Sequence, residues 1–66
     1  MQITINGEPR CFDAPLSLAE LIVRLDLGGK RVAVERNGEI VPRSRHAETP
    51  LAESDRLEIV VAVGGG

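Results

Sequence analysis

The chain has 66 residues, of which 42% are hydrophobic and 27% are charged, and its formal net charge is -2. A chain of this length forms one domain and buries only about 60% of its unfolded surface, so a binding, carrier or regulatory role is favoured over a self-contained enzyme with a deep active-site cavity. Acidic and basic residues are interspersed and Phe12 is the only aromatic residue, which argues against a nucleic-acid-binding surface.

The N-terminal segment predicts a β-hairpin. Residues 1–5 alternate between apolar and polar side chains, as expected for a strand with one buried face. Asn6-Gly7 follows, and both residue types tolerate the positive φ angles of a two-residue turn. Residues 8–12 are therefore predicted to return as the second strand.

The register of this hairpin creates a conflict. A two-residue turn places Phe12 opposite Met1 on the apolar face, but it also turns Glu8 and Arg10 toward the core. A β-bulge near Pro9 would relieve the conflict, so the register stays open at this point.

A helix is predicted next. Ser17-Leu18-Ala19-Glu20 matches the capping-box pattern, with Ser17 as the N-cap and Glu20 three residues later. Leu16 and Leu21 are spaced as a hydrophobic staple around this cap. The apolar stripe that follows at helical spacing consists of Leu18, Leu21, Ile22 and Leu25. Gly28-Gly29 is predicted to end the helix after roughly three turns.

A second hairpin follows the helix. Residues 31–36 are predicted to form a strand, Asn37-Gly38 its turn, and residues 39–41 a short returning strand. Residues 42–52 show no clear period and contain two prolines, so we expect an irregular connection with one short helical turn.

The last predicted strand covers residues 56–63, after a turn at residues 53–55. It is apolar on both faces in its second half, which fits a central position in a sheet. Its first face contains Leu57, Ile59, Val61 and Val63, and its second face contains Glu58, Val60 and Ala62.

These elements predict an α+β fold of the ubiquitin-like, or β-grasp, type. One main helix packed on one face of a mixed four- to five-stranded sheet buries the apolar stripes, and a strand that returns after a helix crossover is expected to be parallel to its neighbour. Residues 1–63 are the predicted domain. Residues 64–66 are predicted to form a flexible C-terminal glycine tail.

The tail, Gly64-Gly65-Gly66, needs its own explanation because glycines cost backbone entropy and bury nothing. Residues without side chains pass through a channel too narrow for any other residue, and they leave a terminal carboxylate open to a reagent. Both properties suit a carboxylate that itself reacts. A frayed end or a cloning remnant is the alternative explanation.

The whole chain resembles the small sulfur carrier proteins of thiamine biosynthesis, the ThiS family. The resemblance rests on Met1-Gln2-Ile3, on Val32-Ala33-Val34-Glu35, on Asn37-Gly38-Glu39-Ile40-Val41-Pro42-Arg43 and on the end from Val60 to Gly66. The small subunit of molybdopterin synthase is similar in fold and tail. It is usually somewhat longer, and it lacks an obvious counterpart of the segment from Asn37 to Arg43. A ubiquitin-like interaction module with an inert tail is a further alternative.

The resemblance implies a protein co-substrate and not an enzyme. An E1-like adenylyltransferase of the ThiF type would adenylate the carboxylate of Gly66 with ATP. A cysteine-derived persulfide donor would convert it to a thiocarboxylate, which would deliver sulfur to a thiazole synthase of the ThiG type. Gly64 and Gly65 would give the tail its clearance and reach. The chain has no phosphate-binding loop of the Gly-x-x-x-x-Gly-Lys type, so the nucleotide is expected on the partner, with no cofactor bound here.

A docking surface is predicted on the second sheet face. Ala33, Val60 and Ala62 are expected to lie together there, away from the helix and next to the tail. Packing under a neighbouring loop, or simple exposure of small residues, is the alternative.

Other reactive residue types carry less weight. Cys11 lacks a neighbouring His or basic cluster and is predicted to be a small, half-buried strand residue. His46 is the only histidine and is predicted to lie on a rim or loop. Arg43 and Arg45 are predicted to be solvated loop charges. No Cys or His cluster predicts a metal site, and no signal peptide or apolar run of ~18 residues is found, so a cytoplasmic protein without membrane association is expected.

Overall fold

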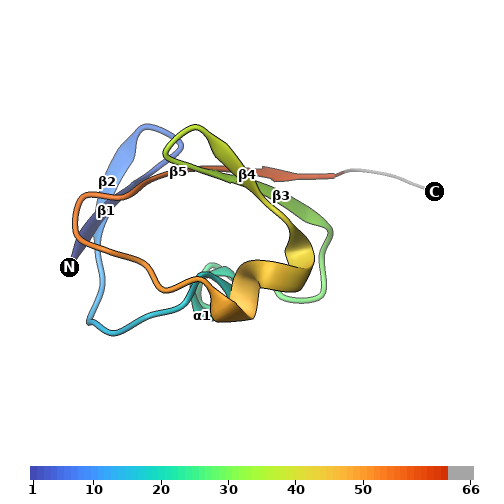
Figure 1. Ribbon diagram of the computed structural model, residues 1–66, viewed down its shortest axis with the longest axis horizontal. Helices are drawn as coiled ribbons and strands as arrows, with labels where there is room; N and C mark the ends of the chain where they lie inside the picture. The colour runs from blue at the N-terminus through green and yellow to red at the C-terminus, as the bar shows by residue number, and fades with distance from the viewer. Residues whose placement is uncertain (63–66) are drawn as a thin grey trace.

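The computed structural model describes residues 1–62; Val63 and the predicted glycine tail fall outside the described residues, as does the predicted boundary between domain and tail. Seven elements follow one another within these described residues (Figure 1). They are β1 (Gln2–Ile5), β2 (Glu8–Cys11), α1 (Leu18–Arg24), β3 (Val32–Arg36), β4 (Glu39–Val41), the 3-10 helix η1 (Arg43–Glu48) and β5 (Arg56–Val61).

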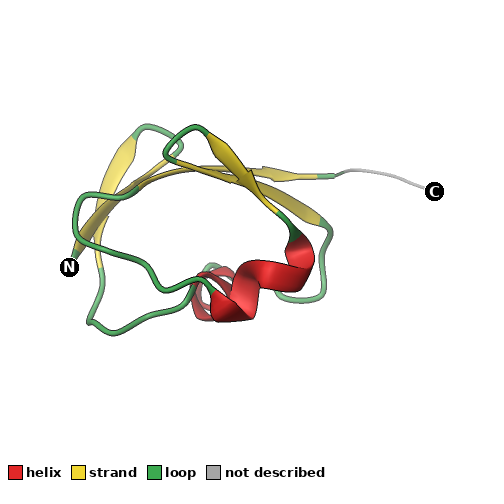
Figure 2. Ribbon diagram, viewed as in Figure 1, coloured by secondary structure: helices red, strands yellow, loops and turns green. Residues whose placement is uncertain are grey.

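The strands form one five-stranded mixed sheet in the order β2-β1-β5-β3-β4. β1 and β5 are parallel, and the other neighbouring strands are antiparallel. Figure 2 shows α1 and η1 on the same side of the sheet, with the opposite face uncovered by any helix. The predicted β-grasp architecture is confirmed, including the central position of the last strand.

Both hairpins turn at the predicted Asn-Gly pairs. Asn6 and Asn37 each have a φ of 51°, and Gly7 and Gly38 have φ angles of 84° and 88°. Two successive positive φ angles define the type I′ turn, whose twist matches that of the flanking strands. The sequence signal was sufficient here because it acts within four residues.

The first hairpin keeps a regular register without a bulge. Ile3 pairs with Arg10 and Ile5 pairs with Glu8, so the two charged residues share the apolar side of the hairpin. This is tolerated because β2 is an edge strand and every residue in it is exposed. The Arg10 guanidinium carbon lies over the Phe12 ring, 6.0 Å from its centre, which is within the range of a cation–π contact.

Helix α1 begins as predicted but ends early. The Glu20 backbone N–H donates to the Ser17 hydroxyl at 3.1 Å, and the Ser17 N–H donates to the Glu20 carboxylate at 2.9 Å. This backbone hydrogen bond from Ser17 is the main cause that lowers the pKa of Glu20. The helix stops at Leu25 because Asp26 adopts a left-handed φ of 62°, so the predicted stop at Gly28-Gly29 was wrong.

Two hydrogen bonds explain the early stop. The Leu27 N–H donates to the Ile22 carbonyl and the Asp26 N–H to the Val23 carbonyl, each at 3.0 Å, which is the Schellman pattern. Asp26 occupies the left-handed position after the helix, where glycine is usual. Because the predicted stop relied on glycine, the sequence did not indicate that the helix ends at this aspartate.

The core lies between the sheet and the two helices. It is formed by Ile3, Ile5, Leu16, Leu18, Leu21, Ile22, Val34, Leu51, Leu57 and Ile59. The predicted irregular connection contains η1 as its short helical turn, and it also supplies Leu51 to the core. Leu51 is held there because its N–H donates to the Leu16 carbonyl at 2.9 Å.

Candidate functional site

Strand β5 leads toward the C-terminal segment. On the side that faces β1, the side chain of Asn6 bonds to the backbone of β5. β1 ends at Ile5, but Asn6 continues the ladder with its side-chain amide. The Ile59 N–H donates to Asn6 Oδ1 at 2.7 Å, and Asn6 Nδ2 donates to the Ile59 carbonyl at 3.1 Å. Both backbone polar groups of Ile59 are thus satisfied by one side chain. The turn residue that shapes the first hairpin also anchors the strand that carries the tail.

Asn37 has the same double use on the other side of β5. Its Oδ1 accepts from the Arg56 N–H at 3.0 Å, and its Nδ2 donates to Asp55 Oδ1 at 3.0 Å. The start of β5 is therefore tied to the second hairpin turn. Sequence reasoning assigned both asparagines to turns and missed this second role, because their partners lie 18 to 53 residues away.

Asp55 is the buried charged group at the start of β5, with 5% of its surface exposed. Its Oδ2 accepts from Arg36 Nε at 2.9 Å and from the Ala52 N–H at 2.8 Å. Burial by itself raises the pKa of Asp55, but the hydrogen bonds from Ala52, Asn37 and Arg36 outweigh it and hold the pKa below its usual value. The carboxylate joins the connection, the second hairpin and β5 at one point.

Among residues 1–62, the outer face of the sheet next to the end of β5 is apolar and exposed. Ala33 pairs directly with Val60, and Ala33, Val60 and Ala62 are all exposed, Val60 to 62%. The prediction that these three residues share an uncovered face agrees with this arrangement. Whether they bind a partner stays a prediction.

Ile40 extends this surface and was missed. It pairs with Glu35 on β3, is 76% exposed, and lines one shallow depression together with Ala33 and Val60. In the run Glu39-Ile40-Val41 the sequence does not show which apolar residue faces outward; the register with β3 decides it. Ala33, Ile40, Val60 and Ala62 are called the outer-face patch below.

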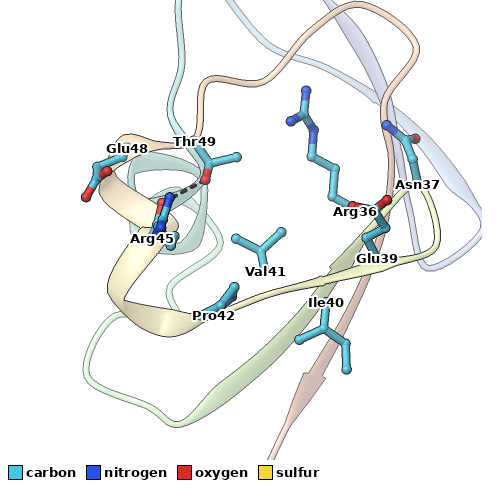
Figure 3. A pocket seen from close by; sticks show the side chains of 9 residues that line it. All are labelled: Arg36, Asn37, Glu39, Ile40, Val41, Pro42, Arg45, Glu48 and Thr49. Carbon is cyan, nitrogen blue, oxygen red and sulfur yellow. Dashed lines mark hydrogen bonds between the residues drawn. The ribbon is translucent and has the colours of Figure 1, made fainter.

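The other side of β4 borders a groove against η1. Figure 3 shows Val41 and Ile40 leaving opposite sides of β4, with Val41 directed into the groove. Two arginines and two glutamates line the groove: Arg36, Arg45, Glu39 and Glu48. The positive and negative charges in the groove balance, and Arg36 is already paired with Asp55. The groove therefore has no excess positive potential that would attract an anion.

Two predictions about single residues were wrong. Cys11 is exposed on the edge strand β2 and not half-buried. His46 is buried in η1, and its Nε2 lies 3.1 Å from the Val41 carbonyl, which can only accept, so Nε2 carries a proton. His46 thus ties η1 to β4. Arg43 and Arg45 are exposed on η1, in agreement with solvated charges.

Within residues 1–62, no three His, Cys, Asp or Glu side chains gather into a potential metal site. None of the helices in this part of the chain is long and apolar enough to cross a membrane. The predicted reactive residues, Gly64, Gly65 and Gly66, lie outside the described residues.

The comparison with protein families decides the identity of this arrangement. The model of the ThiS family matches residues 3–66. The chain belongs to the ThiS family. A crystal structure of the thiamine biosynthesis protein ThiS from Geobacter metallireducens superposes with a TM-score of 0.83 at 33% identity, and each chain is covered completely.

Relatives of this ThiS-family chain occur both as small proteins and within longer ones. The chain is 42% identical over 50 residues to the sulfur carrier protein ThiS of Bacillus subtilis, covering 76% of either chain. It is 46% identical over 66 residues to a thiazole synthase of Paramagnetospirillum magneticum. That match covers 100% of this chain but only 20% of the thiazole synthase.

Proposed function

We propose that this chain carries sulfur for the formation of the thiazole of thiamine, as a thiocarboxylate at Gly66. The observation that carries the proposal is the ThiS-family match, which extends through the three glycines to Gly66. The architecture supports it, because β5 is the central strand of the sheet and runs directly toward that end. The relatives that bear the names thiazole synthase and sulfur carrier protein favour the thiazole pathway over molybdopterin.

The proposed chemistry starts from a terminal carboxylate, which has a pKa near ~3.5 and is ionised at neutral pH. Its oxygen attacks the α-phosphate of ATP and releases pyrophosphate, which leaves an acyl adenylate. The terminal sulfur of a cysteine-derived persulfide attacks the carbonyl carbon and displaces AMP. A second thiol then cleaves the acyl disulfide, which leaves the thiocarboxylate on Gly66 and a new disulfide on the donor side.

The partners of this chemistry supply what the chain lacks. An E1-like adenylyltransferase of the ThiF type binds ATP and activates Gly66. A thiazole synthase of the ThiG type receives the sulfur; that some relatives combine a region like this chain with the name thiazole synthase supports this pairing. The carrier itself is a co-substrate that is consumed and regenerated, and not a catalyst.

Intact mass tests the proposal. After incubation with the ThiF-type adenylyltransferase, ATP and a cysteine-derived sulfur donor, the C-terminal peptide should gain the mass that exchanges one oxygen for one sulfur. The mass before incubation shows whether the Gly66 carboxylate is free. Omission of ATP should prevent the gain. An unchanged mass in the complete mixture would support the non-covalent module instead.

Docking of the adenylyltransferase on the outer-face patch gives a second prediction. Val60→Asp should weaken binding by about 10-fold or more, because an unpaired carboxylate would be buried in the interface. Val23→Asp is the matched control, since Val23 is exposed to 67% on α1, on the helix side of the sheet. Calorimetric titration measures both, with thermal unfolding to verify the fold. Equal affinity of Val60→Asp and wild type would remove the patch from the interface.

A further inference from the structure

Two carboxylates face each other on the outer side of the sheet. Glu35 on β3 pairs directly with Glu58 on β5, and both are exposed. The Asn37 N–H donates to the Arg56 carbonyl at 2.8 Å, so Asn37 and Arg56 form a hydrogen-bonded pair. Hydrogen-bonded and non-hydrogen-bonded pairs alternate along an antiparallel ladder, so Glu35 and Glu58, two residues away, are also a hydrogen-bonded pair. The Cα atoms of such a pair are about 5.5 Å apart. Like charges directly opposite each other destabilise a sheet.

Neither carboxylate of this pair takes part in an ion pair within residues 1–62. Within residues 1–62 the ion pair that forms is Arg36 with Asp55, at 2.9 Å on the start of β5. Arg56 lines a shallow depression together with Glu35 and Glu58, but it makes no ion pair with either of them in the described part of the chain. A local rule of sheet design is therefore broken without a compensating ion pair among residues 1–62, which is typical of functional surfaces.

The two carboxylates border the outer-face patch. Glu35 pairs with Ile40 on its other side, and the next outward pair along the two central strands is Ala33 with Val60. One depression is lined by both glutamates together with Ile40, Ala33 and Val60. A partner that covers the apolar patch would thus partly desolvate both carboxylates, which makes their neutralisation necessary.

We propose that Glu35 and Glu58 together receive an arginine side chain of the protein that docks on the outer-face patch. This inference rests on the proposed function and names the partner surface: one guanidinium surrounded by apolar side chains. Arginine fits because its planar fork donates to two acceptors at once and stays charged, whereas lysine presents a single point charge. The repulsion between the glutamates in the free chain is relieved when the guanidinium lies between them.

The experiment compares stability with affinity. Glu35→Gln and Glu58→Gln should each raise the midpoint of thermal unfolding by about 1–4 °C, because each removes the repulsion. Each should also weaken binding to the purified ThiF-type adenylyltransferase by about 10-fold, measured by calorimetric titration. The double variant should lose less than the product of the two single losses, since one guanidinium serves both carboxylates.

The control is Glu8→Gln, which removes the same charge from the exposed edge strand β2 and should change neither quantity. Unchanged affinity of both single variants, with wild type still converted to the thiocarboxylate, would overturn the arginine contact and leave the proposed function standing. If wild type neither binds nor is modified by the adenylyltransferase, both the contact and the proposed function are overturned.

Discussion

Gly65→Val is expected to abolish formation of the thiocarboxylate at Gly66, with a loss on the order of 100-fold or more in the rate of adenylation. Three extended residues span about 10 Å, which is enough to bring the carboxylate from the end of the domain into an active site on the partner. A branched side chain within that span would collide with a channel shaped for glycine. The adenylation rate is measured by pyrophosphate release.

Gly65→Ala provides the graded control, because it adds a single methyl group and should lose less activity than valine. Gly64→Val should behave like Gly65→Val. All three variants should unfold thermally with the wild-type midpoint, since glycine has no side chain that a hydrophobic core could lose. Full activity of both valine variants would show that the partner leaves room for side chains, and the channel would have to be abandoned.

Asp55→Ala is expected to lower the free energy of unfolding by about 3 kcal/mol, because it leaves Arg36 and the Ala52 N–H without their acceptor. A domain of this size has a total stability of roughly 3–10 kcal/mol, so the variant should keep only about 0–7 kcal/mol. Urea denaturation measures the loss. Asp13→Ala is the control, since Asp13 is exposed, and it should change stability by less than about 0.5 kcal/mol.

The same carboxylate predicts an acid limit to stability. The folded pKa of Asp55 is lowered, so its contribution is complete above the unfolded pKa of about 3.9 and is lost as the pH falls through the folded pKa. Wild type should therefore lose stability below about pH 4. Asp55→Asn should lose less over that range, whereas Glu20, whose pKa is also lowered, affects both proteins equally. Identical pH profiles would remove Asp55 as the cause.

Local signals were the reliable part of the sequence. The two Asn-Gly turns, the capping box at Ser17 and the alternation along β5 each depend on contacts within a few residues, and the structure has all of them. The helix end was wrong because the Schellman hydrogen bonds at Asp26 use backbone groups, which any residue type supplies.

Long-range pairing decided what the sequence left open. His46 was expected at a rim, but η1 packs against α1 and its His46 ring bonds to the Val41 carbonyl of β4, so the side chain is buried. Ile40 faces outward because β4 is in register with β3, and a shift of one residue would have turned it inward. Asp55 was predicted to be a turn residue, although three groups from two segments, Arg36-Asn37 and Ala52, donate hydrogen bonds to it.

The sequence by itself determined the order of the elements, the fold class, the apolar second face of the last strand and the glycine end that points to a sulfur carrier. The elements and the fold class follow from periodicity and from the conformational limits of single residues, whereas the sulfur-carrier role was implied by the resemblance to the ThiS family. Only the tertiary structure decided which residues complete the outer-face patch, how Asn6 and Asn37 hold β5, and that Glu35 faces Glu58. Each of these depends on strand register, which is set by the whole core and not by any short segment.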